Sequence, residues 1–210
     1  MAEPEKYQDA LNRYCDCMEE LKRRISVIDK FLSRAITTGY KQTDVESMCL
    51  QMRKVLELIA LASLVANKAE YSKQHKKFAD HWHAARILQD LEAVNPNFYP
   101  VPGEQVLDPQ TGEVVRIRPL IDGFLTRNEF SSVYDTCSSI LHAENPYGPR
   151  ADIEDIQRRL PDWRARIICL LNHHQTQLAE TDLQFWVLMH CKEEGKVQAW
   201  IFKRLGPTTA

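Results

Sequence analysis

The sequence contains little glycine, since only 7 of its 210 residues are Gly. It has no G-x-x-x-x-G-K and no G-x-G-x-x-G pattern, the glycine-rich loops whose backbone amides hold phosphate groups. It also lacks G-x-S-x-G, the sharp turn that presents a nucleophilic serine. These absences exclude a classical nucleotide-binding α/β enzyme, and they leave little support for nucleophilic catalysis.

The chain also lacks an excess of charge and a long apolar run. Lys and Arg number 27 against 29 Asp and Glu, so the net charge of −2 argues against a general binder of DNA or membrane surfaces. The apolar run Leu58–Ala66 is about half the length of a membrane span. The first residues, MAEPEKYQDALNRY, carry charges where a secretory signal needs an apolar segment. We therefore expect a cytoplasmic protein with no membrane contact.

Cysteine and histidine patterns predict neither disulfides nor a metal site. Six cysteines are too few to form a disulfide framework in a chain of this length, so we expect reduced thiols. Cys15 and Cys17, like His81 and His83, lie two residues apart, and such side chains diverge by about 200° on a helix. The adjacent pair His173-His174 diverges in the same way. The sequence predicts no cofactor and no bound metal.

The first segment predicts one long helix that ends near Gly39. Its apolar residues recur at alternating steps of four and three, which is typical of a helix packed lengthwise against another. They are Tyr7, Leu11, Tyr14, Met18, Leu21, Ile25, Ile28, Leu32 and Ala35. Surplus apolar surface on a small protein often marks an interface, so we assign this seam, together with the apolar C-terminal hairpin, to self-association.

Two further helices are predicted before residue 96. Thr43-Asp44-Val45-Glu46 has the pattern of a capping box that opens the second helix. Apolar residues then cover several sides of the segment from Met48 to about Tyr71, which is typical of a helix at the centre of a bundle. A third helix is expected from about Lys77 to Val94, where Asn95-Pro96 ends it.

The rest of the chain predicts two helices and two β-hairpins. Thr126-Arg127-Asn128-Glu129 is a second capping box, and a last helix starts near Ala151, with Pro161 expected to kink or divide it. The apolar seam of this last helix runs from Ile153 to Leu170 and could extend to His174. A hairpin at about 100–119 is interpreted as an insertion, and the segments 185–191 and 197–203 form a C-terminal hairpin. The predicted fold is mainly α, an up-down bundle of four or five helices. Residues 1–183 form the bundle, and residues 184–210 form a hairpin and tail in the same domain.

The segment from Tyr134 to Pro146 contains the strongest candidates for chemistry. His142 follows an amphipathic helix, whose macrodipole favours a protonated imidazole at the C-terminal end. Asn145 could fix the tautomer of His142 or bind a phosphate-like ligand. The competing interpretation is structural: His142 caps the helix carbonyls and Asn145-Pro146 turns the chain.

Two segments together resemble the HEPN superfamily: Cys49-Leu-Gln-Met-Arg53-Lys-Val-Leu-Glu57 in a central helix, and Tyr134…Ser138…Leu141-His142 at the end of a later one. HEPN proteins are helical bundles of bacterial abortive-infection, toxin-antitoxin and nucleotidyltransferase-partner systems. The resemblance spans roughly residues 5 to 178. It implies a helical homodimer in a defence or stress module.

The resemblance also implies a chemistry. Active HEPN ribonucleases cut RNA without a metal, using a His as acid or base and an Arg four to six residues before it to hold the scissile phosphate. His142 matches that histidine, but positions 136 to 138 are Thr, Cys and Ser. Arg127 is a full helix away, about 22 Å at 1.5 Å per residue. Arg53 or Arg150 would supply the positive charge only if the fold brings one of them close.

A basic cluster lies near the same region of the sequence and has two interpretations. In the first interpretation the cluster binds RNA or a nucleotide phosphate, with Arg158 as a further candidate contact. In the second, which is favoured, the cluster is the solvated face of a helix and nearby acidic residues neutralise its charge. Its members are Arg150, Arg158, Arg159, Arg164 and Arg166.

Three functions follow as hypotheses. The first is a non-catalytic or weakly catalytic HEPN-like protein that binds RNA, a nucleotide or a partner protein as a homodimer. The second is a metal-independent ribonuclease that uses His142, Asn145 and Tyr134, with Arg53, Arg150 or Arg158 on the phosphate. The third is a scaffold whose C-terminal hairpin adds a strand to a partner protein.

Overall fold

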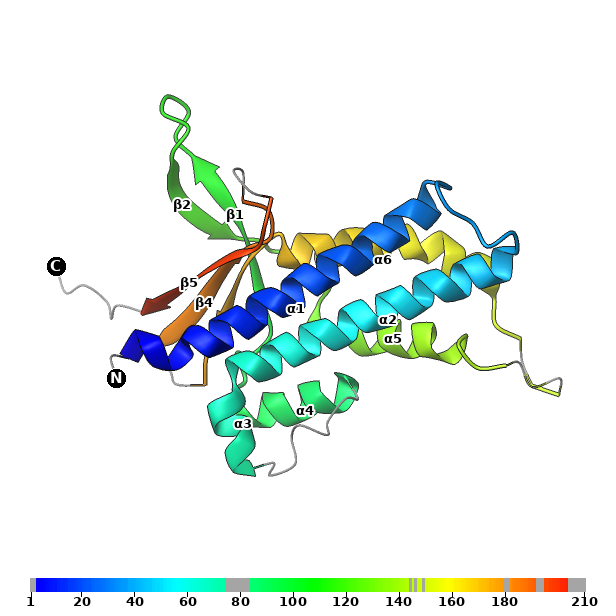
Figure 1. The fold of residues 1–210 in the computed structure, drawn as a ribbon, viewed down its shortest axis with the longest axis horizontal. Helices are drawn as coiled ribbons and strands as arrows, with labels where there is room; N and C mark the ends of the chain where they lie inside the picture. The colour runs from blue at the N-terminus through cyan, green and yellow to red at the C-terminus, as the bar shows by residue number, and fades with distance from the viewer. Residues whose placement is uncertain are drawn as a thin grey trace.

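The structure is a computed structural model that describes residues 3–74, 84–143, 145, 147–148, 150–179, 182–191 and 195–203. Within these residues the chain forms six helices and five strands. Long helices run alongside one another, and a curled sheet lies at one end of them (Figure 1). The fold is therefore mixed α and β rather than mainly helical, which corrects the predicted class.

The helix α1 (Glu3–Leu32) packs lengthwise against α2 (Lys41–Ala66), as its apolar periodicity predicts. The seam from Tyr7 to Ile28 is buried inside the chain. Because these side chains already have partners, the assignment of the seam to self-association is wrong. The helix also ends earlier than Gly39, and Arg34 after it adopts a left-handed backbone with φ 59°.

The start of α2 differs from the prediction, although its central position is confirmed. Its N-cap is Tyr40, whose side chain accepts no capping hydrogen bond from the backbone amides of the helix, so Thr43 and Glu46 form no capping box. The Asp44 carboxylate instead accepts hydrogen bonds from the hydroxyls of Thr37 and Thr38, at 2.7 Å each, which fixes the turn before the helix. Further along, α2 buries residues on several sides.

The segment after α2 forms two short helices, α3 (Lys68–Gln74) and α4 (Ala84–Val94). The predicted helix from Lys77 overlaps only α4, because residues 75–83, with His81 and His83, lie outside the described residues. As predicted, α4 ends directly before Asn95. The Asn95 amide donates to Asn67 Oδ1 at 2.8 Å and to the Gln177 carbonyl at 3.0 Å, so it joins the helices to the sheet.

The helices α5 (Arg127–Ser139) and α6 (Ile153–Leu171) follow the sequence pattern closely. The capping box is confirmed: the Thr126 side chain accepts from the Glu129 amide, and the Glu129 side chain accepts from the Thr126 amide. Pro161 lies within α6, which continues through it and is not divided. The helix ends at Leu171, so the expectation that its seam reaches His174 is wrong.

The two predicted hairpins belong to one antiparallel sheet, with the order β2-β1-β3-β4-β5. The first hairpin is β1 (Val101–Leu107) with β2 (Val114–Pro119), and the second is β4 (Leu183–Leu188) with β5 (Gln198–Lys203). The strand β3 (His173–Gln177) lies between the two hairpins and joins them. Its residue Gln175 lies opposite Val101 of β1 on one side and opposite Trp186 of β4 on the other. The hairpin at 100–119 therefore extends the sheet and does not decorate the helices.

The two faces of the sheet differ in their surroundings. On one face, Thr176, Phe185 and Val187 are buried against the helices, and the ring of Tyr14 from α1 meets Phe185 edge-on at 5.7 Å. On the other face, Trp200 and Phe202 are exposed. The strand period of two thus divides β4 and β5 into a core side and an open side.

Candidate functional site

His142 lies just beyond α5, on an exposed turn. The helix ends at Ser139, where the hydroxyl of Ser138 donates to the Tyr134 carbonyl at 2.7 Å and the Leu141 amide donates to the Ser138 carbonyl at 3.2 Å. Local groups therefore satisfy these terminal carbonyls. In the described residues the imidazole of His142 caps no helix carbonyl, which leaves it accessible to solvent.

Asn145 shapes the turn that follows. Its side-chain oxygen accepts a hydrogen bond from the Tyr147 amide at 3.1 Å, and its carbonyl accepts one from the Gly148 amide at 2.9 Å. This is a typical use of asparagine, whose short amide stabilises a turn two residues ahead. Among the described residues, no hydrogen bond involves the Asn145 side-chain nitrogen.

The tertiary structure brings Arg150 to the same place. His142, Asn145 and Arg150 line one hollow of about 340 Å³, which also includes Gln42 from the start of α2 and Ser139 from the end of α5. We call this feature the His142 hollow. It combines an imidazole, an amide and a guanidinium, three groups that donate hydrogen bonds to phosphate oxygens.

The other arginines of the basic cluster are engaged with carboxylates. Arg158 and Arg159 both pair with Asp155, at 2.7 and 3.5 Å. Arg164 pairs with Asp29 and Arg166 with Glu129. Within the part of the chain that the structure describes, Arg150 makes no ion pair. The interpretation as a solvated, neutralised helix face therefore fits Arg158 and Arg159, whereas Arg164 and Arg166 connect α6 to α1 and α5. Arg150 differs from all four.

Tyr134 and Arg53 lie together, away from the His142 hollow. The Arg53 guanidinium lies over the Tyr134 ring, 5.4 Å from its centroid, and its Nε donates to Glu57 at 3.1 Å. Burial raises the pKa of the Tyr134 phenol, and the positive charge of Arg53 opposes the shift only in part. Tyr134 therefore stays protonated near neutral pH, and this cluster connects α2 to α5.

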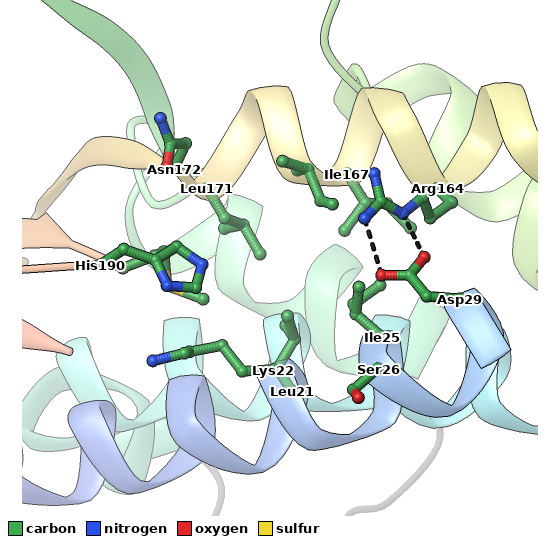
Figure 2. A pocket seen from close by; sticks show the side chains of 12 residues that line it. Leu21, Lys22, Ile25, Ser26, Asp29, Arg164, Ile167, Leu171, Asn172 and His190 are labelled. Carbon is green, nitrogen blue, oxygen red and sulfur yellow. Dashed lines mark hydrogen bonds and ion pairs between the residues drawn. The ribbon is translucent and has the colours of Figure 1, made fainter. Parts of the chain in front are cut away.

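A second recess lies between α1 and α6, and no sequence pattern indicates it (Figure 2). It encloses about 380 Å³, and its walls are mostly apolar side chains such as Leu21, Ile25 and Ile167. At one end the guanidinium of Arg164 binds the carboxylate of Asp29 through two hydrogen bonds of 2.7 and 2.8 Å (Figure 2).

The charged groups around the α1–α6 recess have partners within the chain. Besides the Arg164–Asp29 pair, the Lys22 ammonium donates to the Gly195 carbonyl at 2.6 Å and lies 3.4 Å from Glu19. The recess therefore suits an apolar molecule better than an anion. The interhelical pair that defines it joins residues 135 positions apart, which no local sequence pattern reveals.

Two neighbouring histidines on β3 have different environments. His174 is fully enclosed, and burial lowers its pKa to about 4, so it is a neutral core residue. Burial also lowers the pKa of His173, although the Gly103 carbonyl nearby opposes this shift. The argument against a metal at this pair assumed a helix, and that assumption is wrong because both histidines lie on the strand β3. On a strand, adjacent side chains also point to opposite faces.

The described ranges contain neither a metal-ion cluster nor a helix that could span a membrane. No group of three or more His, Cys, Asp or Glu side chains there is arranged to hold a metal ion. No described helix combines the length and apolarity needed to cross a bilayer. All six cysteines are free thiols, but only Cys49 and Cys137 are buried, and the other four are half-buried.

Comparison with known proteins assigns no relative to the chain: no family model, no curated protein and no solved structure matches it. The HEPN resemblance therefore stays a prediction, based on the residues that carry it.

Proposed function

We propose that this protein is a HEPN-like member of a bacterial defence or stress module that binds RNA at the His142 hollow. The observation that carries the proposal is that Arg150 lines the same hollow as His142. The sequence lacks an arginine just before the histidine, and Arg150 takes its place from the far side of a turn. A guanidinium that is free of carboxylates in the described structure can bind phosphate oxygens with two parallel hydrogen bonds.

The overall charge of −2 is compatible with this proposal, because binding would be local. A protein with one or two phosphate contacts shows weak affinity that falls moderately with salt, since the salt dependence scales with the number of neutralised phosphates. We expect single-stranded RNA to be preferred, because its unstacked bases and flexible backbone can adapt to a shallow hollow.

The direct test is the affinity for a fluorescein-labelled single-stranded RNA, measured by fluorescence anisotropy at two salt concentrations. Arg150→Ala should weaken binding about tenfold, as for the loss of one hydrogen bond to a charged group. Arg158→Ala is the matched control: it removes the same charge from an exposed arginine that is paired with Asp155. Equal losses for the two variants, or no binding by the unmodified protein, would contradict the proposal.

Metal-independent ribonuclease activity is the second candidate, favoured by the shared location of His142 and Arg150. In this reaction the imidazole removes the proton of a ribose 2′-hydroxyl and the oxygen attacks the adjacent phosphorus. The bond from phosphorus to the 5′-oxygen breaks, the 5′-oxygen takes a proton from water, and the products are a 2′,3′-cyclic phosphate and a 5′-hydroxyl. Arg150 would stabilise the charge on the phosphoryl oxygens. Cleavage of RNA in EDTA that disappears in His142→Ala would support this candidate, whereas binding without cleavage would leave only the first.

A homodimer remains part of the proposal, but its interface must differ from the first-helix seam. The open face of the β4–β5 hairpin, with exposed Trp200 and Phe202, is the surface that still fits this role. Sedimentation of the full chain tests it: Trp200→Ser should shift a dimer towards monomer, whereas Tyr147→Ser at another exposed aromatic residue should not.

A further inference from the structure

A recess in the sheet, separate from the His142 hollow, is lined by two residues whose buried polar atoms are unsatisfied within the described part of the chain. It is lined by residues of β2, β1, β3 and β4 and encloses about 190 Å³. Its lining includes Pro102, Gly103, Ile117, His173 and Trp186. The sheet and the end of α5 lie at opposite ends of the molecule, so this recess is independent of the proposed RNA site (Figure 1).

The two atoms are Nδ1 of His173 and Nε1 of Trp186. Both are buried and make no hydrogen bond of good geometry in the part of the chain that the structure describes, although the Gly103 carbonyl lies close to the His173 ring. His173 is 7% exposed, and its ring lies 6.0 Å from that of Trp186 at an angle of 60°. Buried polar groups in folded proteins are nearly always satisfied, so a pair of unsatisfied atoms lining one recess indicates a missing partner.

The size of the recess limits what that partner is. A single water molecule needs roughly 10–15 Å³ of cavity volume, so the recess is large enough for several water molecules or for one small ring. Gly103 leaves the space open: a β-carbon at this position would lie 2.9 Å from Cγ2 of Ile117 and 3.8 Å from Nδ1 of His173.

The chemistry of the lining residues excludes a strongly charged ligand. No Asp, Glu, Lys or Arg is among them, and the histidine is neutral near pH 7 because burial lowers its pKa. An ion entering this site would find no opposite charge. The indole nitrogen of Trp186 can only donate, whereas a neutral imidazole nitrogen donates or accepts according to its tautomer. The ligand must therefore present an acceptor to Trp186.

We propose that this recess binds a small, planar, uncharged cyclic amide that carries a carbonyl oxygen beside an N–H group. The carbonyl accepts from Nε1 of Trp186, and the neighbouring N–H donates to Nδ1 of His173. Pro102 and Ile117 supply flat and apolar walls for the ring. Uracil has this arrangement of groups and serves as the probe.

The test follows the indole N–H signals of the four tryptophans by NMR while uracil is added to the full chain. Trp186→Phe identifies the Trp186 signal. We expect a saturable shift of that signal. The compound 1,3-dimethyluracil, which keeps both carbonyls but has no N–H, should bind at least tenfold more weakly. This comparison changes only the ligand, so it does not depend on the folding of a variant.

Variants of the protein give the complementary result. His173→Phe and Gly103→Ala should each weaken uracil binding at least tenfold, the first by removing the acceptor and the second by narrowing the recess. Gln184→Ala, on the same strand and face as Trp186 but outside the lining, should bind normally. A shift caused by acetate and not by uracil would overturn the proposal. So would the absence of any saturable shift, which would mean that the recess holds only water.

Discussion

The hydroxyl group of Tyr14 lies 2.8 Å from Nε2 of His174, across 160 residues of sequence. On the other side of the ring, Nδ1 lies 2.7 Å from the Leu171 carbonyl, which can only accept, so Nδ1 carries the hydrogen and Nε2 accepts from Tyr14. The Tyr14 oxygen also lies 3.1 Å from Oγ1 of Thr176. This buried network joins α1, the end of α6 and β3.

Replacing Tyr14 with Phe removes only one oxygen atom, but it should lower the stability of the protein substantially. The change leaves Nε2 of His174 buried without a donor, which costs about 1–3 kcal/mol of unfolding free energy. Urea denaturation followed by circular dichroism measures the effect. Tyr147→Phe is the matched control, because Tyr147 is 97% exposed and should change stability by less than about 0.5 kcal/mol. Equal effects would show that the network contributes nothing.

The stability of the protein should fall between pH 6.5 and pH 4 because of His174. In the unfolded chain this histidine binds a proton near its ordinary pKa of 6.5, but in the folded protein its pKa is about 4. The unfolded state thus binds more protons in this range, and the free energy of unfolding decreases by up to about 1.4 kcal/mol per pH unit. Below pH 4 the contribution of His174 is constant.

Urea unfolding at pH 7 and at pH 5.5 measures how the free energy of unfolding depends on pH. Both values lie above the range in which most carboxylates titrate, so the carboxylates contribute little to the difference. His174→Gln should reduce the difference between the two values, while His173 supplies a smaller part in the same direction, since burial lowers its pKa too. NMR of the unmodified protein gives an independent check: the His174 ring should stay neutral down to about pH 4.5, and protonation near pH 6.5 would refute the prediction.

The two capping boxes expected from the sequence allow the same substitution to be compared at two helix starts. Thr126 accepts from the Glu129 amide, and Glu129 also binds Arg166, so Thr126→Ala should cost about 1 kcal/mol. Thr43 lies within the first turn of α2 and caps nothing. Thr43→Ala should therefore change stability by less than about 0.5 kcal/mol. Denaturation midpoints of both variants test this, and a larger loss at Thr43 would contradict it.

The Asp29–Arg164 pair should couple α1 to α6 weakly but measurably. Both side chains are partly exposed, at 41% and 32%, so solvent screens the attraction and we expect a coupling of about 0.5–1 kcal/mol. A double-mutant cycle with Asp29→Ala and Arg164→Ala measures it, and the coupling should decrease in 1 M salt. The Asp155–Arg158 pair, whose arginine is 74% exposed, should give a smaller value in the same experiment.

Helix positions were predictable where the signal is local. The seam of α1, the capping box of α5 and the stop before Asn95 all depend on residues within one or two turns, and all are confirmed. The error at α2 has a local cause as well. Thr43 and Glu46 have the correct spacing, but the carboxylate of Asp44 between them binds Thr37 and Thr38 and moves the helix start to Lys41.

The sheet was not predictable as one unit, because its central strand has no strong sequence signal. His173–Gln177 is short and polar, and it follows α6 with only Asn172 between them, so the sequence favoured a continuing helix. Its conformation depends on backbone hydrogen bonds to β1 and β4, which come from distant parts of the chain.

The sequence by itself determined the amphipathic helices, both hairpins and the absence of glycine-rich phosphate loops, since these follow from residue type and spacing. Only the tertiary structure decided that Arg150 lies beside His142 while Arg53 does not, and that His173 and Trp186 share a recess. The physical reason is that secondary structure follows short-range preferences, whereas a site needs side chains from separate elements at distances set by the packing of the whole core.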